Sequence, residues 1–526
     1  MDDKEVKDAP VGLLRSSALV GLMTMLSRVL GLLRDVALAT YLGAAANADA
    51  FFIAFKIPNF LRRLFAEGAF SQAFVPVLSE YRTLQPHAAV QLLVNKVAAS
   101  LGGSVLMLTG LVVMGAPWVV YVFAPGFSDE PEKLELTASL LRITFPYLAM
   151  ISLAGFGGAI LNSYGRFAIP AITPVLLNLS LIGAAVWFAP HVTEPTFALA
   201  WGVFVAGCAQ LLFQLPFLYR LELLPKPQWD WGDEGVKRIL KLMVPAMFGV
   251  SVSQINLLLD TVLASFLPTG SVSWLYFSDR LSELPLGVFA IAVSTVILPS
   301  LSRDHAGADS NKFSATLDWA IRMVALIALP AMVALVVLAE PILMTLFQYG
   351  EMNGRDVAMS ALSLRAYAVG LLAFMLIKVL APGYYSRQDT ATPVRIGIYA
   401  MAANMVLNIV LVVPLHMYYQ VGHVGLALAT SLAAWLNAIL LWRGLVKKSL
   451  YIRQPGFISH LGKLLTAVVV MTLGLWMMMP LLGDLLAQAW WQRSMLLLAV
   501  CAVGAIMYFL CLFILGLRPR NLSAPG

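Results

Sequence analysis

The feature that most constrains this chain is a succession of long apolar segments. About fourteen of them reach the ~20 residues that an α-helix needs to cross the hydrocarbon core of a bilayer. Of the 526 residues, 60% are hydrophobic and only 12% are charged, whereas charged residues form about 25% of an average soluble domain. The sequence therefore predicts an all-α polytopic membrane protein, with spans near 13–42, 47–63, 95–123, 135–163, 167–189, 196–220, 237–267, 272–299, 315–347, 356–385, 393–414, 422–445, 460–482 and 493–517. The segment 64–82 after the second span resembles an amphipathic or broken helix.

The lysines and arginines between these segments predict the orientation of the chain. Cytoplasmic loops are rich in both residues, and alternate loops of this chain follow that pattern, whereas the opposite set offers only Lys133, Arg355 and Arg493. The alternation places both termini in the cytoplasm. It also accounts for the net charge of +7, so we expect no nucleic-acid partner. The cysteines Cys208, Cys501 and Cys511 lie in apolar runs without metal-ligand spacing, which favours core residues over disulfides or a metal site.

Two segments half a chain apart resemble each other. LRDVALATYLG (33–43) aligns with LLDTVLASFLP (258–268), and the even number of spans between them gives both copies the same orientation. This pattern indicates a parallel repeat. We expect two pseudo-symmetric six-helix lobes, residues 1–224 and 225–450, followed by two helices and a tail at 451–526. Chance similarity between apolar helices is the alternative.

Charged residues interrupt several of the predicted spans. SRVLGLLRD (27–35) places two arginines and an aspartate inside an apolar run. Intramembrane charge usually faces a cavity and serves a function, although snorkelling at helix ends or structural ion pairing by Asp35 or Asp49 would also explain it. The candidate cavity residues from this reading are Arg28, Arg34, Asp49, Lys56, Arg62, Arg63, Asp279, Arg280, Glu283 and Lys378.

The sign of these charges indicates the kind of ligand. Basic residues exceed acidic ones in the first lobe, and a cavity of that sign favours an anion. Arginine makes planar, bidentate contacts that suit phosphate groups. We therefore expect an anionic substrate, such as a phosphate or a diphosphate.

A second polar group lies in the other lobe. It comprises Asp260, Asn404, Asn408 and Thr430, whose oxygen atoms are of the kind that binds a small cation such as Na⁺. Hydrogen bonds between helices are the alternative role for the Asn and Thr side chains.

The sequence contains neither a catalytic signature nor a phosphate-binding loop for ATP. We therefore expect a transporter and not an enzyme, without a cofactor, and driven by the membrane potential, by a partner or by a gradient of Na⁺ or H⁺.

Five long motifs resemble those of the MurJ (MviN) family of lipid II flippases. They are SRVLGLLRD, DAFFIAFKIPNFLRRLFAEGAFSQAFVPVLSEY, GSVSWLYFSDRLSELPLGVFA, TLFQYG and KVLAPGYYSRQDTATPV. The resemblance runs from about residue 12 to beyond residue 450, in register with the predicted spans. It implies a fold of the multidrug/oligosaccharidyl-lipid/polysaccharide (MOP) exporter superfamily and a place in the bacterial inner membrane.

The resemblance also implies a substrate and a set of site residues. The substrate would be lipid II, an undecaprenyl diphosphate that carries a disaccharide-pentapeptide, moved to the periplasmic face by alternating access for peptidoglycan synthesis. The family's important charged residues correspond to Arg28, Arg34, Asp49, Arg62, Arg63, Glu67, Asp279 and Arg280. Of these, Arg28, Arg34 and Arg280 would hold the diphosphate, while Asp49 and Glu67 would set a gate or position the arginines.

The expected partners are lipid II and membrane lipids. We expect a monomer, with association with the cell-wall synthesis machinery as a further expectation. The rival interpretations are a flippase for another polyprenyl-diphosphate sugar and a cation-coupled multidrug exporter of the same superfamily, the latter suiting an acidic cavity better than a basic one. A membrane enzyme or a structural scaffold would explain the buried charges less well.

Overall fold

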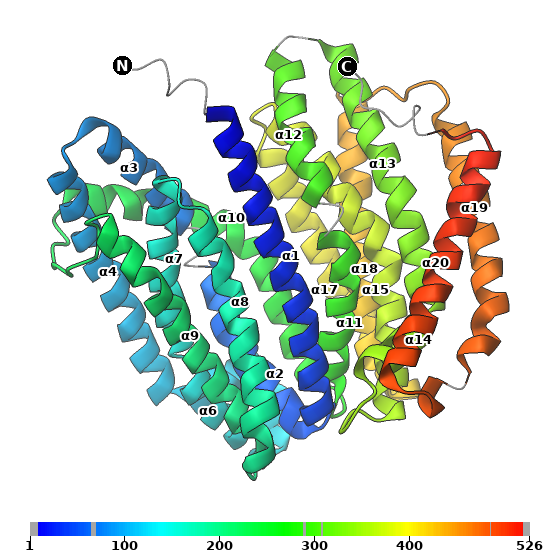
Figure 1. Ribbon diagram of the computed structural model, residues 1–526, viewed down its shortest axis with the longest axis horizontal. Helices are drawn as coiled ribbons and strands as arrows, with labels where there is room; N and C mark the ends of the chain where they lie inside the picture. The colour runs from blue at the N-terminus through cyan, green and yellow to red at the C-terminus, as the bar shows by residue number, and fades with distance from the viewer. Residues whose placement is uncertain (1–8, 65–69, 288–290, 307–308, 484, 519–526) are drawn as a thin grey trace. The chain divides into compact units, whose positions relative to one another are not determined.

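The computed structural model describes residues 9–64, 70–287, 291–306, 309–483 and 485–518. All regular secondary structure in these ranges is helical (Figure 1), which confirms the predicted all-α fold. By its internal contacts the chain divides into two compact units, unit 1 (Met1–Thr269) and unit 2 (Gly270–Gly526). The lobe boundary predicted at residue 224 rests on the sequence repeat instead of on contacts, and it stays a prediction.

The described part of unit 1 is built from α-helices and short helical turns. They are α1 (Ala9–Leu42), α2 (Ala46–Leu61), α3 (Ser71–Leu84), α4 (His87–Met114), α5 (Ala116–Phe123), η2 (Pro125–Asp129), α6 (Pro131–Thr144), α7 (Tyr147–Ser163), α8 (Ala168–Gly183), η3 (Ala184–Phe188), η4 (Ala189–His191), α9 (Pro195–Arg220) and α10 (Glu234–Ser265). The segment predicted as amphipathic includes α3, whose buried face is formed by Ala73, Phe74, Val77 and Leu78. That face joins a core with residues of α4, α7 and α10.

The α10 helix belongs to unit 1 because both of its ends are fixed there. Arg238 near its start makes two hydrogen bonds to the carboxylate of Glu80 on α3, at 2.8 and 2.6 Å. At its other end, the backbone N–H of Gly126 donates to Ser265 Oγ at 3.0 Å. A Cβ atom at position 126 would lie 2.3 Å from the Ser265 carbonyl oxygen, so this close backbone approach requires glycine.

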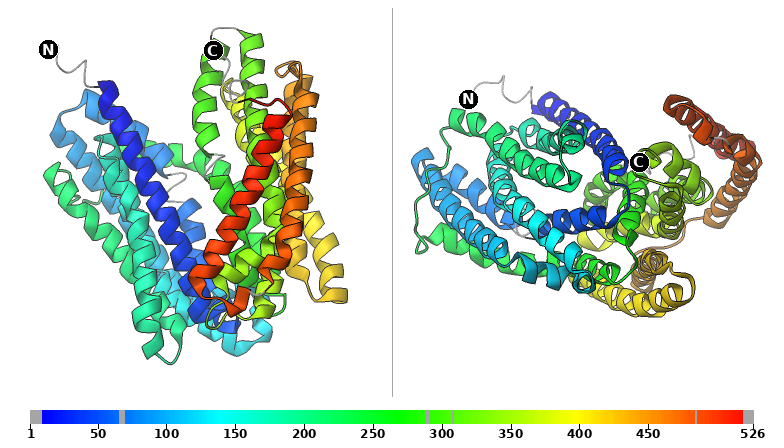
Figure 2. Two further views of the ribbon diagram at one scale, coloured as in Figure 1. Left: turned by 45° about the vertical axis from the view of Figure 1, so that its right-hand side comes forward. Right: turned by 90° about the horizontal axis from the view of Figure 1, so that it is seen from below.

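Unit 2 contains the remaining helices. They are α11 (Ser271–Pro285), α12 (Ile291–Ala306), α13 (Ser310–Val337), α14 (Ala339–Phe347), α15 (Gly354–Leu380), α16 (Pro382–Tyr385), α17 (Ala391–Tyr419), α18 (Gly422–Lys447), α19 (Phe457–Met478), η6 (Met479–Leu482), η7 (Leu485–Ala487) and α20 (Trp490–Ile514). The last two long helices, α19 and α20, run side by side in every view (Figures 1 and 2). Their apolar side chains pack with those of α13 in one cluster, which includes Leu329, Leu464 and Tyr508.

Ten helical segments of the described residues are long and apolar enough to cross a membrane. The predicted spans outside this set are 13–42, 47–63, 237–267 and 272–299, and these four carry every candidate charge from the sequence analysis except Glu67 and Lys378. In two of these spans the helices are also short, since α2 has 16 residues and α11 has 15. The count of fourteen spans and the cytoplasmic termini stay predictions.

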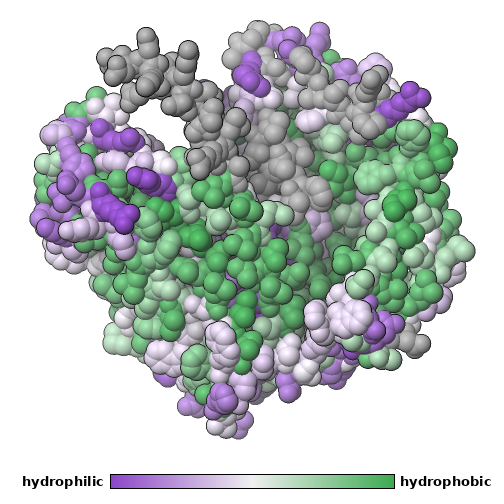
Figure 3. Space-filling model, in the orientation of Figure 1, coloured by the Kyte–Doolittle hydropathy of each residue, from purple (hydrophilic) through white to green (hydrophobic). Residues whose placement is uncertain are grey.

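The surface of unit 1 has the polarity of a membrane protein. Figure 3 shows hydrophobic side chains gathered along the middle of α8 and α9 and hydrophilic ones near α3. Leu179, Val205 and Leu212 are among the exposed apolar residues of α8 and α9. A continuous apolar surface of this kind is stable against lipid and not against water.

Candidate functional site

One buried cluster of charges from the sequence analysis lies on α1. The guanidinium of Arg34 donates twice to Oδ1 of Asp35, from Nε at 3.0 Å and from Nη2 at 2.7 Å. Both side chains are buried. The structure thus confirms that Asp35 pairs with an arginine, one of the two explanations that the sequence left open for this carboxylate.

A third residue from another helix completes this cluster. Asn178 on α8 accepts a hydrogen bond from Arg34 Nη1 at 3.0 Å and donates from Nδ2 to the carbonyl oxygen of Ser27 at 2.9 Å. One buried amide therefore fixes the arginine and the α1 backbone two turns earlier. Arg28 follows Ser27 directly and is half-buried on the same helix.

The second predicted acid, Asp49, has a lysine as a partner. Its Oδ2 lies 3.5 Å from Nζ of Lys133 on α6, and both residues are buried. The same ammonium group lies 3.7 Å from Glu130 Oε1 and 4.3 Å from the centre of the Phe127 ring. The sequence analysis assigned Lys133 to a loop, and the structure corrects this: it belongs to α6 and is 5% exposed, because Asp49 supplies the opposite charge that its burial requires.

The other predicted residues of α2 lie in different surroundings. Lys56 is exposed, although Asp49, seven residues earlier, is buried. Arg62 is half-buried and Arg63 is exposed, both at the end of α2. Glu67 lies outside the described residues. Of the predicted charges on and just after α2, Asp49 is thus buried, Arg62 is half-buried, and Lys56 and Arg63 are exposed.

In unit 2, the predicted charges lie on α11 and α15. Arg280 Nη1 is 3.2 Å from Glu283 Oε2, and its guanidinium lies 5.0 Å from the centre of the Tyr276 ring. Asp279 is half-buried on the same helix, and Lys378 is exposed near the end of α15.

The proposed cation ligands divide between the two units. Asn404 and Asn408 are fully buried on α17, next to α18, on which Thr430 donates to the Leu426 carbonyl within its own helix. Asp260 belongs to α10 and therefore to unit 1. The role of these four residues as a cation site stays a prediction.

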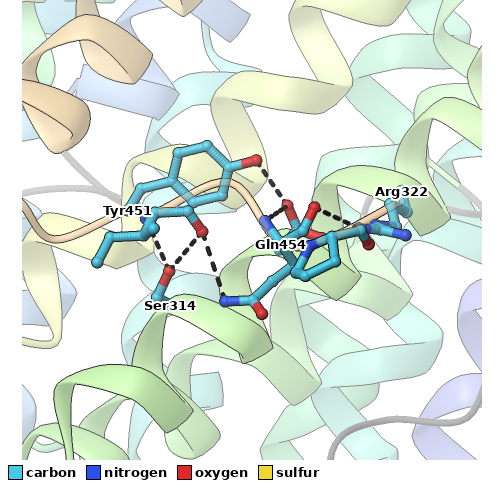
Figure 4. Close-up of polar contacts among 7 residues, drawn as sticks. Ser314, Arg322, Tyr451 and Gln454 are labelled. Carbon is cyan, nitrogen blue, oxygen red and sulfur yellow. Dashed lines mark hydrogen bonds and ion pairs between the residues drawn. The ribbon is translucent and has the colours of Figure 1, made fainter. Parts of the chain in front are cut away.

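The sequence analysis missed one extensive polar network, which lies in unit 2 (Figure 4). Asp318 on α13 accepts from Arg322 Nε at 2.6 Å, from the Tyr451 hydroxyl at 2.7 Å and from the Gln454 backbone at 3.4 Å. Arg322 Nη2 in turn donates to the carbonyl oxygens of Gln454 and Pro455 at 3.3 and 3.1 Å. The signal for this network was present, because Asp318 and Arg322 are an i, i+4 pair of opposite charge inside an apolar run.

This network holds the loop between α18 and α19. Ser314 both donates to and accepts from the backbone of Ile452, at 2.9 and 2.8 Å. Burial and the hydrogen bond to Asp318 raise the pKa of the Tyr451 hydroxyl, so it stays protonated and acts as a donor. These contacts form a structural clamp on the loop that directly precedes α19.

Comparison with known proteins identifies the family. The family model described as "Lipid II flippase MurJ" matches residues 38–500. The chain is 49% identical to the probable lipid II flippase MurJ of Vibrio cholerae serotype O1, over 97% of this chain and 98% of that protein. It is 41% identical to the lipid II flippase MurJ of Burkholderia cenocepacia, over 97% of this chain and 98% of that protein.

Solved structures agree with this relationship. A structure described as "Lipid II flippase MurJ, inward closed conformation" matches with a TM-score of 0.76 at 26% identity, over 96% of this chain and 99% of that chain. A multidrug resistance MATE family transporter of the MOP superfamily, in an inward-facing conformation, matches with a TM-score of 0.66 at 16% identity, over 82% of this chain and 98% of that chain, a likeness of fold alone. The family model and the relatives agree, and the chain belongs to the MurJ family of lipid II flippases.

Proposed function

We propose that this protein moves lipid II from the cytoplasmic to the periplasmic face of the bacterial inner membrane, where the precursor is used for cell-wall synthesis. The observation that carries this function is the similarity to lipid II flippases over 97% of the chain at 41 to 49% identity. The protein is a multi-pass inner-membrane protein of a transporter family. Lipid II and membrane lipids are its partners.

The physical problem of this transport is the polar headgroup. The hydrocarbon core is ~30 Å thick, and a diphosphate that crosses it without compensation loses its hydration. Alternating access solves this problem, because the headgroup enters a polar site from one side and leaves it to the other while the lipid tail stays in the bilayer. An inside-negative potential favours outward movement of an anion by ~2.3 kcal/mol per charge per 100 mV.

The residues that we propose for this site follow from their charge and placement. Arg28 and Arg34 on α1 supply positive charge for the diphosphate, and Arg280 is the candidate from unit 2. The Asp35 and Asn178 contacts orient Arg34 before the substrate arrives, which lowers the entropic cost of binding. Asp49, with Lys133 as its counter-ion, acts in positioning instead of in direct binding.

The remaining expectations concern energy and assembly. We propose that the protein catalyses no covalent reaction, needs no cofactor and acts as a monomer, with Na⁺ or H⁺ as candidate coupling ions. Association with the cell-wall synthesis machinery is a further proposal. The multidrug-exporter alternative is not favoured, because its support is a likeness of fold at 16% identity.

Depletion in cells tests the function directly. After depletion, we expect the fraction of lipid II that an added, membrane-impermeant lipid II hydrolase can cleave to fall, while total lipid II rises. Wild-type protein should restore cleavage. Unchanged accessibility after depletion would contradict the flippase function, and restored accessibility of a different polyprenyl-diphosphate sugar alone would favour that substrate.

A further inference from the structure

We propose that the loop between α9 and α10, residues 221–233, anchors unit 1 in the interface of the bilayer through Trp229 and Trp231. The partner is the lipid itself, at the boundary between headgroups and acyl chains. This inference does not depend on which substrate the protein carries. Figure 1 shows the loop beside α4 at the edge of unit 1.

The backbone of the loop is fixed to α4 at one level of that helix. The N–H of Lys226 donates to Asn95 Oδ1 at 2.8 Å, and the N–H of Gln228 donates to the Asn95 carbonyl at 3.3 Å. The next residue of α4, Lys96, lies 2.9 Å from Asp230 Oδ2 and 2.7 Å from Asp233 Oδ2. The hydrogen bond to Lys96 lowers the pKa of Asp230, so the carboxylate stays charged. Backbone N–H groups of the loop bind Asn95, and Lys96 forms ion pairs with two carboxylates. Polar groups of this kind indicate that this level of α4 is in the polar zone of the membrane.

The indole ring of Trp229 extends from this level toward the apolar part of α4. A Cβ atom at Gly103 would lie 1.9 Å from the Trp229 ring, and the three nearest atoms to that position all belong to this ring. Gly103 is seven residues beyond Lys96, which is ~10 Å along a helix at 1.5 Å per residue. The exposed side chains of Leu106 and Met107 follow within the next turn. The ring therefore lies next to the lipid-facing surface of a membrane-spanning helix.

Both tryptophans present large surfaces outside the protein. Trp229 is 63% exposed and Trp231 is 50% exposed, and their ring centres are 6.3 Å apart. In water this apolar surface would be unfavourable. At the membrane interface it is favourable, because an indole has an apolar body and an N–H donor and is enriched there. The continuity with Leu106 and Met107 favours lipid over a soluble partner.

Fluorine NMR of the full-length protein in lipid nanodiscs tests this placement. The 12 tryptophans are labelled as fluorotryptophan, and the signals that disappear in Trp229→Phe and Trp231→Phe identify the two residues. A lipid with a nitroxide near the top of its acyl chain is then added in one sample and a water-soluble gadolinium chelate in another. We expect loss of the Trp229 signal with the lipid nitroxide and its retention with the chelate.

A pair of glycine variants on α4 provides the matched control. Gly103→Ala must displace the ring and should shift the Trp229 signal, whereas Gly110→Ala, with no atom within 4 Å of its Cβ position, should leave it unchanged. This pair also identifies the signal if Trp229→Phe does not fold. Loss of the Trp229 signal with the chelate and its retention with the lipid nitroxide would overturn the anchor and leave the loop facing the cytosol, open to a soluble partner.

Discussion

Two arginine–aspartate pairs in this protein have the same composition but differ in burial, since Arg34 and both aspartates are buried whereas Arg322 is half-buried. Arg34 and Asp35 are neighbours on α1 of unit 1, and Asp318 and Arg322 are one turn apart on α13 of unit 2. The closest N–O distances are 2.7 and 2.6 Å, so the strength of the ion pair does not distinguish them. The distinction lies in what else each arginine contacts.

In the α13 pair, both members bind the chain itself. Arg322 donates to two loop carbonyl oxygens, and Asp318 uses both of its oxygens for groups of its own unit. In the α1 pair, the described contacts of Asp35 go through Oδ1, and Arg34 is oriented by the side chain of Asn178. The loop carbonyl partners of Arg322 indicate a structural clamp, whereas for Arg34, which Asn178 orients, we propose a part in recognition. An intramembrane ion pair is therefore not evidence of a binding site until its other partners are known.

Removal of the Asp318 carboxylate should have the largest effect on stability. Asp318→Ala leaves Arg322 and Tyr451 without their shared acceptor, and breaking a buried pair in this way costs about 3–5 kcal/mol. We expect a lower free energy of unfolding in nanodiscs and unchanged transport per folded molecule. Asp309→Ala is the control on the same helix, since it removes only an N-cap worth about 1 kcal/mol. Lost transport with full stability would assign the α13 pair to the transport site.

The opposite result is expected for the α1 pair. Arg34→Lys keeps the charge that neutralises Asp35 but cannot make the same fork of hydrogen bonds, so transport should fall about 10- to 100-fold, or about 1.4–3 kcal/mol, at near-normal stability. The measurement is lipid II accessibility in depleted cells at matched protein level. The matched variant Arg322→Lys should lower stability and spare transport. If both variants behave alike, the proposed difference between the pairs is wrong.

The fold was accessible from the sequence because its determinants are periodic and local. Long apolar runs predict helices, and the charges of α1, α2, α10 and α11 marked the helices that carry the candidate site. The end of unit 1 at Thr269 was harder to predict, because the ends of α10 are fixed by Glu80 and Gly126, which are far away in the sequence.

The partners of each charge could not be predicted for the same reason. Asn178 is 144 residues from Arg34, and nothing in the α8 sequence marks it as the residue that orients an arginine. Lys133 was read as a loop residue because its burial depends on Asp49, a contact between two helices. Asp318 and Arg322 carried a local signal, but the loop that completes their network follows more than 130 residues later.

Asn178 allows a finer test of the α1 cluster. Asn178→Leu removes the acceptor for Arg34 and the donor to Ser27, which should reduce transport by about 1–2 kcal/mol, or about 5- to 30-fold. Asn178→Asp keeps the acceptor and should recover part of the loss. The double variant of Asn178→Leu and Arg34→Lys tests whether Asn178 acts through Arg34. If it does, the loss of Asn178 should reduce transport little further once Arg34 is changed. Fully additive losses would show that Asn178 acts independently of Arg34.

The smallest effect is expected for a more exposed ion pair, which sets the scale for the pairs on α1 and α13. Asp389 lies 2.9 Å from Lys448 Nζ and also accepts from Thr392. The hydrogen bond from Lys448, followed by those from Thr392, lowers the pKa of Asp389 from 3.8 to about 2. Because the folded-state pKa is depressed, the stability from this pair is present above the unfolded value and is lost as the pH falls from about 4 to about 2.

Solvent screening limits the size of this contribution. The side chains of Asp389 and Lys448 are 28% and 49% exposed, so we expect less than about 1 kcal/mol. The measurement is the free energy of unfolding of wild type and of Asp389→Asn at about pH 5 and again at about pH 3. The difference between the two proteins should shrink at the lower pH and in high salt. The comparison fails if Asp389→Asn lowers the free energy of unfolding as much as Asp318→Ala does, or if its effect does not change with pH. Exposure would then not explain the difference between this pair and the clamp on α13.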